Sequence, residues 1–166
     1  QQAIESRDPV LFFEPKAKYW QKGEVDLSQP PAELHRTRVA RVGTDVTVVG
    51  IGAMGTTLLR AIISATGRLQ SVEVVDLRSI SPIDYEPLLV SVRKTGRLVV
   101  AQEAPGTASV GSEIAATVAE RAFYSLHAPV LRVSGYDTPF PPAAVETMYL
   151  PDADRVLEAV DRTMHY

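Results

Sequence analysis

Short valine-rich runs alternate along the chain with longer stretches whose apolar residues recur at helical spacing. Residues 45–55, DVTVVGIGAMG, show the pattern most clearly. Their valines predict a strand buried on both faces, as in a parallel sheet. Gly50, Gly52 and Gly55 then allow the backbone to turn sharply into a helix, because glycine lacks a Cβ and accepts positive φ. This helix is predicted to run to about Thr66.

The first predicted helix has one apolar side. Leu58, Leu59, Ile62 and Ile63 recur at helical spacing and are expected to face the sheet. Gly67 is the expected stop. One strand, one glycine turn and one helix therefore form the unit that the rest of the chain repeats.

The alternation of strand and helix continues to the C-terminus. Asp84 is an expected N-cap and Gly96 the expected end of the second helix. The last helix is expected to bury Val156, Leu157, Val160 and Met164. The remaining predicted elements are the tail of a helix at 1–7, strands at 10–13, 71–76, 98–101 and 130–133, a helix at 109–126 and the last helix from 151. Such alternation requires right-handed crossovers, so the expected fold class is α/β, a three-layer α/β/α arrangement on a mostly parallel sheet.

Length and composition narrow the function classes. The 166 residues suit one domain with an extension, and the net charge is 17 − 20 = −3 without a long run of either sign. Arg36, Arg38 and Arg41 are isolated from other basic clusters, which favours an edge strand or linker over a nucleic-acid surface. The absence of cysteine excludes disulfides and thiolate sites. No apolar run reaches the ~20 residues of a membrane span, and no signal peptide is visible.

The glycine turn has two interpretations. Gly50, Gly52 and Gly55 match the dinucleotide-binding fingerprint, and Asp76 ends the next strand, where a ribose-binding carboxylate is found in that family. The alternative is a tight strand-to-helix turn, which any α/β domain can use.

Catalytic motifs are missing from the sequence. There is no nucleophile elbow, phosphate-binding loop or HExxH motif, and His35, His127 and His165 lack metal-ligand spacing. Glu103 follows a strand at the carboxyl edge, but it lacks a partner acid or base, which favours hydrogen bonding to backbone amides. Asp137 precedes Thr-Pro and has two interpretations, a ligand-binding carboxylate or the turn former that is common before Thr-Pro. No catalytic, cofactor-binding or metal-binding residue is therefore assigned.

Five stretches together resemble a known family. They are FFEPK at 12–16, VEVVDLRSISPID at 72–84, KTGRL at 94–98, EAP at 103–105 and GYDTPFP at 135–141. Their order and spacing resemble the β subunit of a thiamine-diphosphate-dependent 2-oxo acid dehydrogenase, most closely the branched-chain enzyme, with pyruvate or acetoin enzymes as alternatives. The resemblance implies a transketolase C-terminal-like domain in which the glycine turn binds no nucleotide.

The resemblance also implies cofactor and partners. In the family, two α and two β subunits oxidatively decarboxylate a 2-oxo acid and transfer the acyl group to a lipoyl group. Thiamine diphosphate lies between α and β, with its diphosphate and magnesium held by α and its aminopyrimidine contacted by a glutamate of the preceding domain of β. The expectation is therefore that this chain serves assembly, is inactive alone, and contacts an α subunit, a second β subunit and the subunit-binding domain of the acyltransferase. Bacterial cytoplasm is the expected location.

The resemblance divides the chain into three parts. Residues 1–15 resemble the end of the preceding pyrimidine-binding domain, 16–36 a linker and 37–166 the transketolase C-terminal-like domain. The chain begins at Gln1 without Met, and we expect it to be part of a longer polypeptide. Tyr166 is an expected docking residue, because relatives dock through the C-terminus of the β subunit and nearby acidic residues. His127 replaces an expected acidic residue there.

Two alternatives remain open. An NAD-binding α/β domain would use Gly50, Gly52, Gly55 and Asp76. The C-terminal domain of another transketolase-like enzyme, such as a deoxyxylulose phosphate synthase, is disfavoured by the GYDTPFP stretch and the C-terminal helix.

Overall fold

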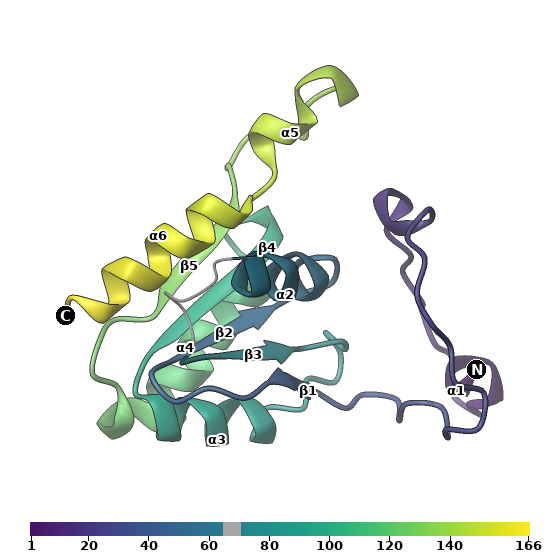
Figure 1. Ribbon diagram of the computed structural model, residues 1–166, viewed down its shortest axis with the longest axis horizontal. Coiled ribbons are helices and arrows are strands. Elements are labelled where there is room, and N and C mark those ends of the chain that lie inside the picture. Colours follow the sequence, from purple (N-terminus) through teal and green to yellow (C-terminus); the bar gives the residue numbers. More distant parts are fainter. Residues whose placement is uncertain (65–70) are drawn as a thin grey trace.

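A five-stranded sheet forms the centre of the molecule (Figure 1). The computed structural model describes residues 1–64 and 71–166. The strands are β1 (Arg38–Arg41), β2 (Val46–Gly50), β3 (Val72–Asp76), β4 (Leu98–Pro105) and β5 (Leu131–Gly135). Their order is β1-β3-β2-β4-β5, and β1 alone among these strands runs antiparallel to its neighbour. The predicted mostly parallel sheet is confirmed.

Helices cover both faces of this sheet. One face packs against α2 (Met54–Ser64) and α6 (Ala153–Met164), and the other against α3 (Glu86–Thr95) and α4 (Val110–Ala122). The three-layer α/β/α prediction is therefore confirmed (Figure 1). The short elements are α1 (Gln2–Glu5), η1 (Lys16–Lys18), η2 (Phe123–Ser125), η3 (Ala143–Val145) and α5 (Glu146–Tyr149).

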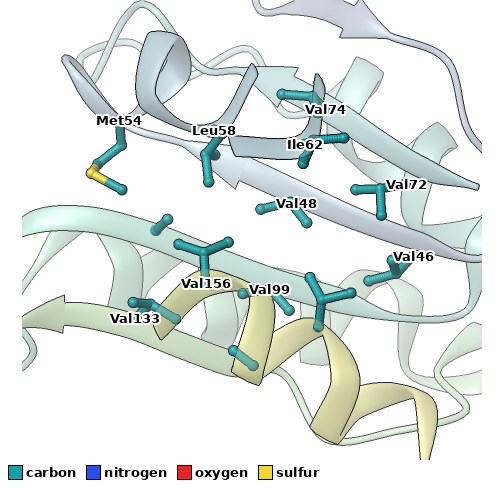
Figure 2. Close-up of a cluster of buried hydrophobic side chains, with 13 residues drawn as sticks. Val46, Val48, Met54, Leu58, Ile62, Val72, Val74, Val99, Val133 and Val156 are labelled. Atoms are coloured by element: carbon teal, nitrogen blue, oxygen red, sulfur yellow. The ribbon is translucent and has the colours of Figure 1, made fainter. Parts of the chain in front are cut away.

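Alternating side chains of β2 fill two separate cores. Val46 and Val48 face α2 and α6, where they meet Leu58 and Val156 (Figure 2). Val49 points to the opposite face, against α3 and α4. Because successive side chains of a strand point to opposite faces, a run of valines is what a strand covered on both sides requires.

Several helices begin or end at the residues that the sequence predicts. Gly96 ends α3 with a φ of 70°, the left-handed conformation that glycine adopts without strain. Ser109 caps α4 by accepting a hydrogen bond from the Ser112 amide, and Asp152 caps α6 by accepting one from the Arg155 amide.

Three predictions about strands need correction. Residues 10–13 form no strand, and Phe12 and Phe13 are exposed, because no other strand of the described chain lies beside them to pair. The predicted strand at 98–101 continues to Pro105, since Pro105 pairs with Gly135 of β5. The sheet has a fifth strand, β1, at its edge, which was not among the four strands predicted to alternate with helices. This strand carries Arg38 and Arg41, in agreement with the interpretation of the arginines as edge-strand residues.

Some helix predictions were wrong in detail. Ile63 is 66% exposed, because the face of α2 that meets the sheet is centred on Leu58 and Ile62. Met164 is also partly exposed at the end of α6. Asp84 does not cap α3; its carboxylate accepts a hydrogen bond from the Thr37 amide instead. The predicted helix end at Thr66 and stop at Gly67 lie outside the described residues.

Glu73 is a buried acid near the start of β3. Its side chain is 3% exposed, forms an ion pair with Lys94 and accepts a hydrogen bond from the Gly43 amide. Burial pulls the pKa of Glu73 upward, but the hydrogen bonds from Lys94, Ser91 and Gly43 outweigh it, so the net pKa lies below its usual range. The ionised carboxylate therefore stabilises the fold.

Glu73→Gln should lower the free energy of unfolding by about 1–2 kcal/mol at neutral pH, because it removes a charge-assisted hydrogen-bond acceptor. A depressed folded-state pKa gives stability that is complete above the ordinary value of 4.5 and is lost as the pH falls through the folded value. The difference between variant and parent should therefore shrink below pH 4.5. Urea unfolding as a function of pH measures it. Glu86→Gln, which breaks only exposed pairs with Arg93 and Arg121, is the control and should change stability little.

Candidate subunit-docking site

The glycine turn between β2 and α2 is tightly packed. A Cβ on Gly50 would lie 2.7 Å from the Gly55 nitrogen and 2.9 Å from Leu58 Cδ1. Gly52 has a φ of 61° and no atoms in the space a Cβ would occupy. Gly50 therefore allows the helix to approach the strand, and Gly52 supplies the left-handed turn.

Asp76 lies against the start of α2. A Cβ on Gly55 would lie 3.0 Å from the nearer Asp76 carboxyl oxygen, so Gly55 makes room for this carboxylate. Burial raises the pKa of Asp76, while Arg78 and Arg38 partly counteract that rise. Gly50 and Gly55 thus have packing roles and Gly52 a conformational one, which agrees with the tight-turn interpretation.

A hollow of about 650 Å³ opens at the carboxyl edge of the sheet. It lies between the ends of β2 and β4, where the strand order reverses direction, the position at which open α/β sheets leave a crevice. Its walls come from the β2–α2 turn, the end of β4 and the start of α4, with Ile80 and Phe13 at the side.

Glu103 and Asp137 lie on this side of the molecule but act differently. Glu103 makes no hydrogen bond to a backbone amide in the described chain, so that predicted role is wrong. Burial raises the pKa of Glu103, the Lys18 charge lowers it and the Glu146 charge raises it. Asp137 accepts hydrogen bonds from the Thr107 amide and hydroxyl at 3.1 and 2.6 Å, which lower its pKa. It ties the loop after β5 to the loop after β4.

The loop after β5 extends into a protrusion, residues 136–149, that stands away from the sheet (Figure 1). Buried Tyr149 anchors it, with edge-to-face contacts to Phe140 and Tyr136 at ring-centroid distances of 5.1 and 6.2 Å. The guanidinium of Arg155 lies 4.9 Å from the centre of the Tyr136 ring. Phe140 and Met148 nevertheless remain exposed. A rigid loop with exposed apolar side chains is typical of a protein–protein contact.

The outer face of α6 forms a second, shallow hollow of about 610 Å³. Three carboxylates line it: Asp154, Glu158 and Asp161, at spacings of four and three residues that place them on one helix face. Leu157 contributes apolar surface, and Tyr166 closes the C-terminal end with its side chain 66% exposed. Arg162 and His165 also line the hollow, so its three carboxylates outnumber a single guanidinium and the face keeps a net negative charge. This combination suits a partner that presents basic side chains around a small apolar contact.

His127 and Tyr166, the two predicted docking residues, lie at the amino edge of the sheet without sharing a hollow. The His127 amide donates a hydrogen bond to the Gly96 carbonyl, and its ring fills the space beside Gly96. The next residue, Arg97, donates a hydrogen bond to the Thr163 carbonyl in the last turn of α6. Tyr166 lines the α6 hollow, whereas His127 does not.

Sequence reasoning missed the individual acidic residues of α6. The i, i+4, i+7 spacing of Asp154, Glu158 and Asp161 was the available signal.

In the described residues no group of three His, Cys, Asp or Glu side chains is placed to hold a metal ion. No helix in the described part of the chain is long and apolar enough to cross a membrane.

The chain matches one family along most of its length. Residues 35–156 match the family described as "Transketolase, C-terminal domain". The chain is 63% identical to the pyruvate dehydrogenase E1 component subunit beta of Leifsonia xyli subsp. xyli, over 100% of this chain and 49% of that protein. It is 44% identical to the 3-methyl-2-oxobutanoate dehydrogenase subunit beta of Mycobacterium tuberculosis, over 98% of this chain and 47% of that protein.

A solved structure is similar in fold and sequence. It is titled "Split gene transketolase, inactive beta4 tetramer" and superposes with a TM-score of 0.71 at 31% identity, covering 86% of this chain and 46% of that chain. The chain spans about half the length of the curated relatives it matches.

Proposed function

This chain belongs to the transketolase C-terminal domain family, and on that premise we propose that it forms the C-terminal part of the β subunit of a thiamine-diphosphate-dependent 2-oxo acid dehydrogenase. The whole enzyme would oxidatively decarboxylate a 2-oxo acid and transfer the acyl group to a lipoyl group. The observation that carries the proposal is the match of essentially the whole chain to dehydrogenase β subunits.

Assembly is the role that we propose for this part of the subunit. The protrusion at 136–149 and the exposed apolar residues at 11–13 supply contact surface for an α subunit and a second β subunit. In the same proposal, residues 1–15 end the preceding pyrimidine-binding domain, 16–36 form a linker, and the whole enzyme works in bacterial cytoplasm.

Thiamine diphosphate and magnesium would be held elsewhere in the assembly. The described residues form no donor set for Mg²⁺, and in the described chain no ion pair or side-chain hydrogen bond joins Glu103, the half-buried acid at the carboxyl edge, to a second acid–base group. We therefore assign no catalytic step to this chain and expect it to be inactive alone.

The acidic face of α6 is the proposed docking site for the subunit-binding domain of the lipoyl acyltransferase. Carboxylates at Asp154, Glu158 and Asp161 would attract basic side chains, and Leu157 with Tyr166 would supply the apolar contact. This arrangement accounts for the predicted docking role of Tyr166.

The proposal extends to the 2-oxo acid that the whole enzyme uses. The branched-chain enzyme is our preferred assignment because of the FFEPK, EAP and GYDTPFP stretches, and the pyruvate enzyme is the alternative favoured by the 63% identical relative. The test compares kcat/KM for pyruvate and 3-methyl-2-oxobutanoate in the enzyme assembled from the complete gene product and its α subunit. Higher kcat/KM for the branched substrate supports the preferred assignment, and higher kcat/KM for pyruvate replaces it.

His127→Glu tests whether the amino edge beside α6 contributes to docking. A carboxylate there restores the charge expected from the resemblance, and we expect binding of the subunit-binding domain to tighten by about two- to fivefold at low salt. Titration calorimetry on the assembled enzyme measures it. Glu120→Gln, on the exposed side of α4, is the control and should bind as the parent does. Unchanged affinity in His127→Glu would show that docking does not involve this edge.

A further inference from the structure

The hollow at the carboxyl edge is an open and mainly apolar surface. Most of the side chains that line its volume of about 650 Å³ are apolar, and Ile80 at its side is 50% exposed. A Cβ on Gly52, in its wall, would meet no other atom within 4 Å, so the β2–α2 turn leaves the hollow unfilled. An exposed apolar hollow on a folded domain is typical of a surface that another folded unit covers.

An acid in this hollow lacks a partner. The Glu103 side chain lines the hollow and is half-buried, and no hydrogen bond or ion pair joins its carboxylate to another group of residues 1–64 and 71–166. A polar group that is taken out of water costs free energy unless it is hydrogen-bonded. A unit that covers the hollow is therefore expected to bring an N–H donor or a cation to Glu103.

Strained backbone gathers at the same edge. In the described chain the residues other than glycine with a positive φ are His35, Arg78 and Ala108, at 58°, 62° and 48°. Ala108 lines the hollow, and Arg78 follows the carboxyl end of β3. His35 Nδ1 lies within hydrogen-bond distance of Ser79 Oγ, at 3.1 Å. Such conformations persist where the surrounding structure fixes them, and they concentrate at functional sites.

The N-terminal segment indicates which unit covers the hollow. Phe13 borders the hollow while 79% exposed, and the Lys18 ammonium group lies 3.5 Å from the Thr57 hydroxyl on α2. In the proposed function residues 1–15 end a preceding domain, so Phe13 belongs to that domain and touches the hollow. Because consecutive Cα atoms are about 3.8 Å apart, the residues just before Phe13 cannot lie far from it.

We propose that the preceding domain of the same subunit packs on the hollow at the carboxyl edge. It would place apolar side chains against Ile80 and Ala108, and a hydrogen-bond donor or cation at Glu103. This inference rests on the proposed function, because it requires the preceding domain. The chain spans 49% and 47% of two relatives, whose remaining length is enough for such a domain. The covalent connection raises the effective concentration of that domain at the hollow, so a modest contact is enough to keep the hollow covered.

Single cysteines test whether the hollow is covered in the complete gene product. The 166 residues contain no cysteine, so a thiol introduced here gives a signal once the reaction of the parent is subtracted. Ile80→Cys lies in the hollow, and Val90→Cys, 55% exposed on α3, is the matched control. In the folded gene product Ile80→Cys should react with a maleimide about tenfold more slowly than Val90→Cys, because the reaction requires the hollow to open. In urea the two thiols should react equally fast.

Two further variants make the test independent of one position. Ala108→Cys, at another exposed position of the hollow, should be shielded as Ile80→Cys is. Glu103→Ala in the Ile80→Cys background should raise the reaction rate about fivefold, because it leaves the donor of the preceding domain unpaired. Glu120→Ala in the same background, on the exposed side of α4, should leave the rate unchanged.

The occupant is identified by the conditions under which the hollow is shielded. Shielding in the β gene product alone, at all protein concentrations, supports the proposal. An Ile80→Cys thiol that reacts as fast as Val90→Cys would overturn it. Shielding that requires the α subunit, or that is lost on dilution as for a second β subunit, would overturn it as well. A gene product that shields Ile80→Cys but does not assemble with an α subunit would contradict the proposed function and leave this contact in place.

Discussion

Gly50→Ala should lower the free energy of unfolding by about 3 kcal/mol, the largest loss expected from any substitution in the glycine turn. The added Cβ would lie 2.7 Å from the Gly55 nitrogen and 2.8 Å from its Cα. These are backbone atoms in the first turn of α2, which cannot move aside as a flexible side chain can. For a chain of this size the melting temperature should fall by about 6–12 °C.

Two other glycines are matched controls for this loss. Gly52→Ala meets no atoms but places a side chain at a φ of 61°, so it should cost about 1–2 kcal/mol. Gly23→Ala meets nothing and should be close to neutral. Calorimetric melting of the three variants measures the order. A Gly50→Ala protein that melts with the parent would show that the turn has room for a Cβ and would contradict the close approach of α2 to β2.

The double variant Glu158→Lys/Asp161→Lys should weaken binding of the subunit-binding domain by about 10- to 100-fold at low salt. The variant replaces two negative charges on the outer face of α6 with two positive charges. A basic partner that the carboxylates attract would be repelled by the lysines. The helix itself should tolerate the change, because both positions are exposed and Asp161 lies in the last turn, where lysine interacts favourably with the helix dipole.

Salt dependence separates this effect from misfolding. The difference between variant and parent affinity should shrink as ionic strength rises, because screening acts on exposed charges. Glu113→Lys/Glu120→Lys, on α4 across the sheet, has the same charge change and should bind as the parent does. If both double variants lose affinity equally, net charge rather than the α6 face controls docking.

Local chemistry explains which parts of the fold could be predicted. Several features depend only on residues close by in the sequence, so a local pattern is enough to predict them. They are the valine run of β2, the left-handed Gly96 and the helix starts at Ser109 and Asp152. Asp84 was misassigned because its partner, the Thr37 amide, is 47 residues away. The end of β4 depends similarly on pairing between Pro105 and Gly135.

In the N-terminal segment and the docking surface, too, contacts between residues far apart in the sequence could not be predicted from local patterns. The apolar run at 10–13 has the pattern of a buried strand, but a strand also needs a neighbour, and the described chain places none beside it. Tyr166 was predicted from the resemblance and lies in the α6 hollow, whereas His127 lies outside it. The contact between Lys18 and Thr57 depends on the path of an irregular segment, which no periodicity encodes.

As the C-terminal part of a dehydrogenase β subunit, this chain should belong to an assembly with an α subunit. Native mass spectrometry of the complete gene product, mixed with its α subunit, thiamine diphosphate and Mg²⁺, tests this assignment. The predicted result is an assembly of two α and two β subunits that decarboxylates a 2-oxo acid, while the 166-residue chain alone does not. Separate α and β masses with no decarboxylation, or turnover by the isolated chain, would contradict the assignment.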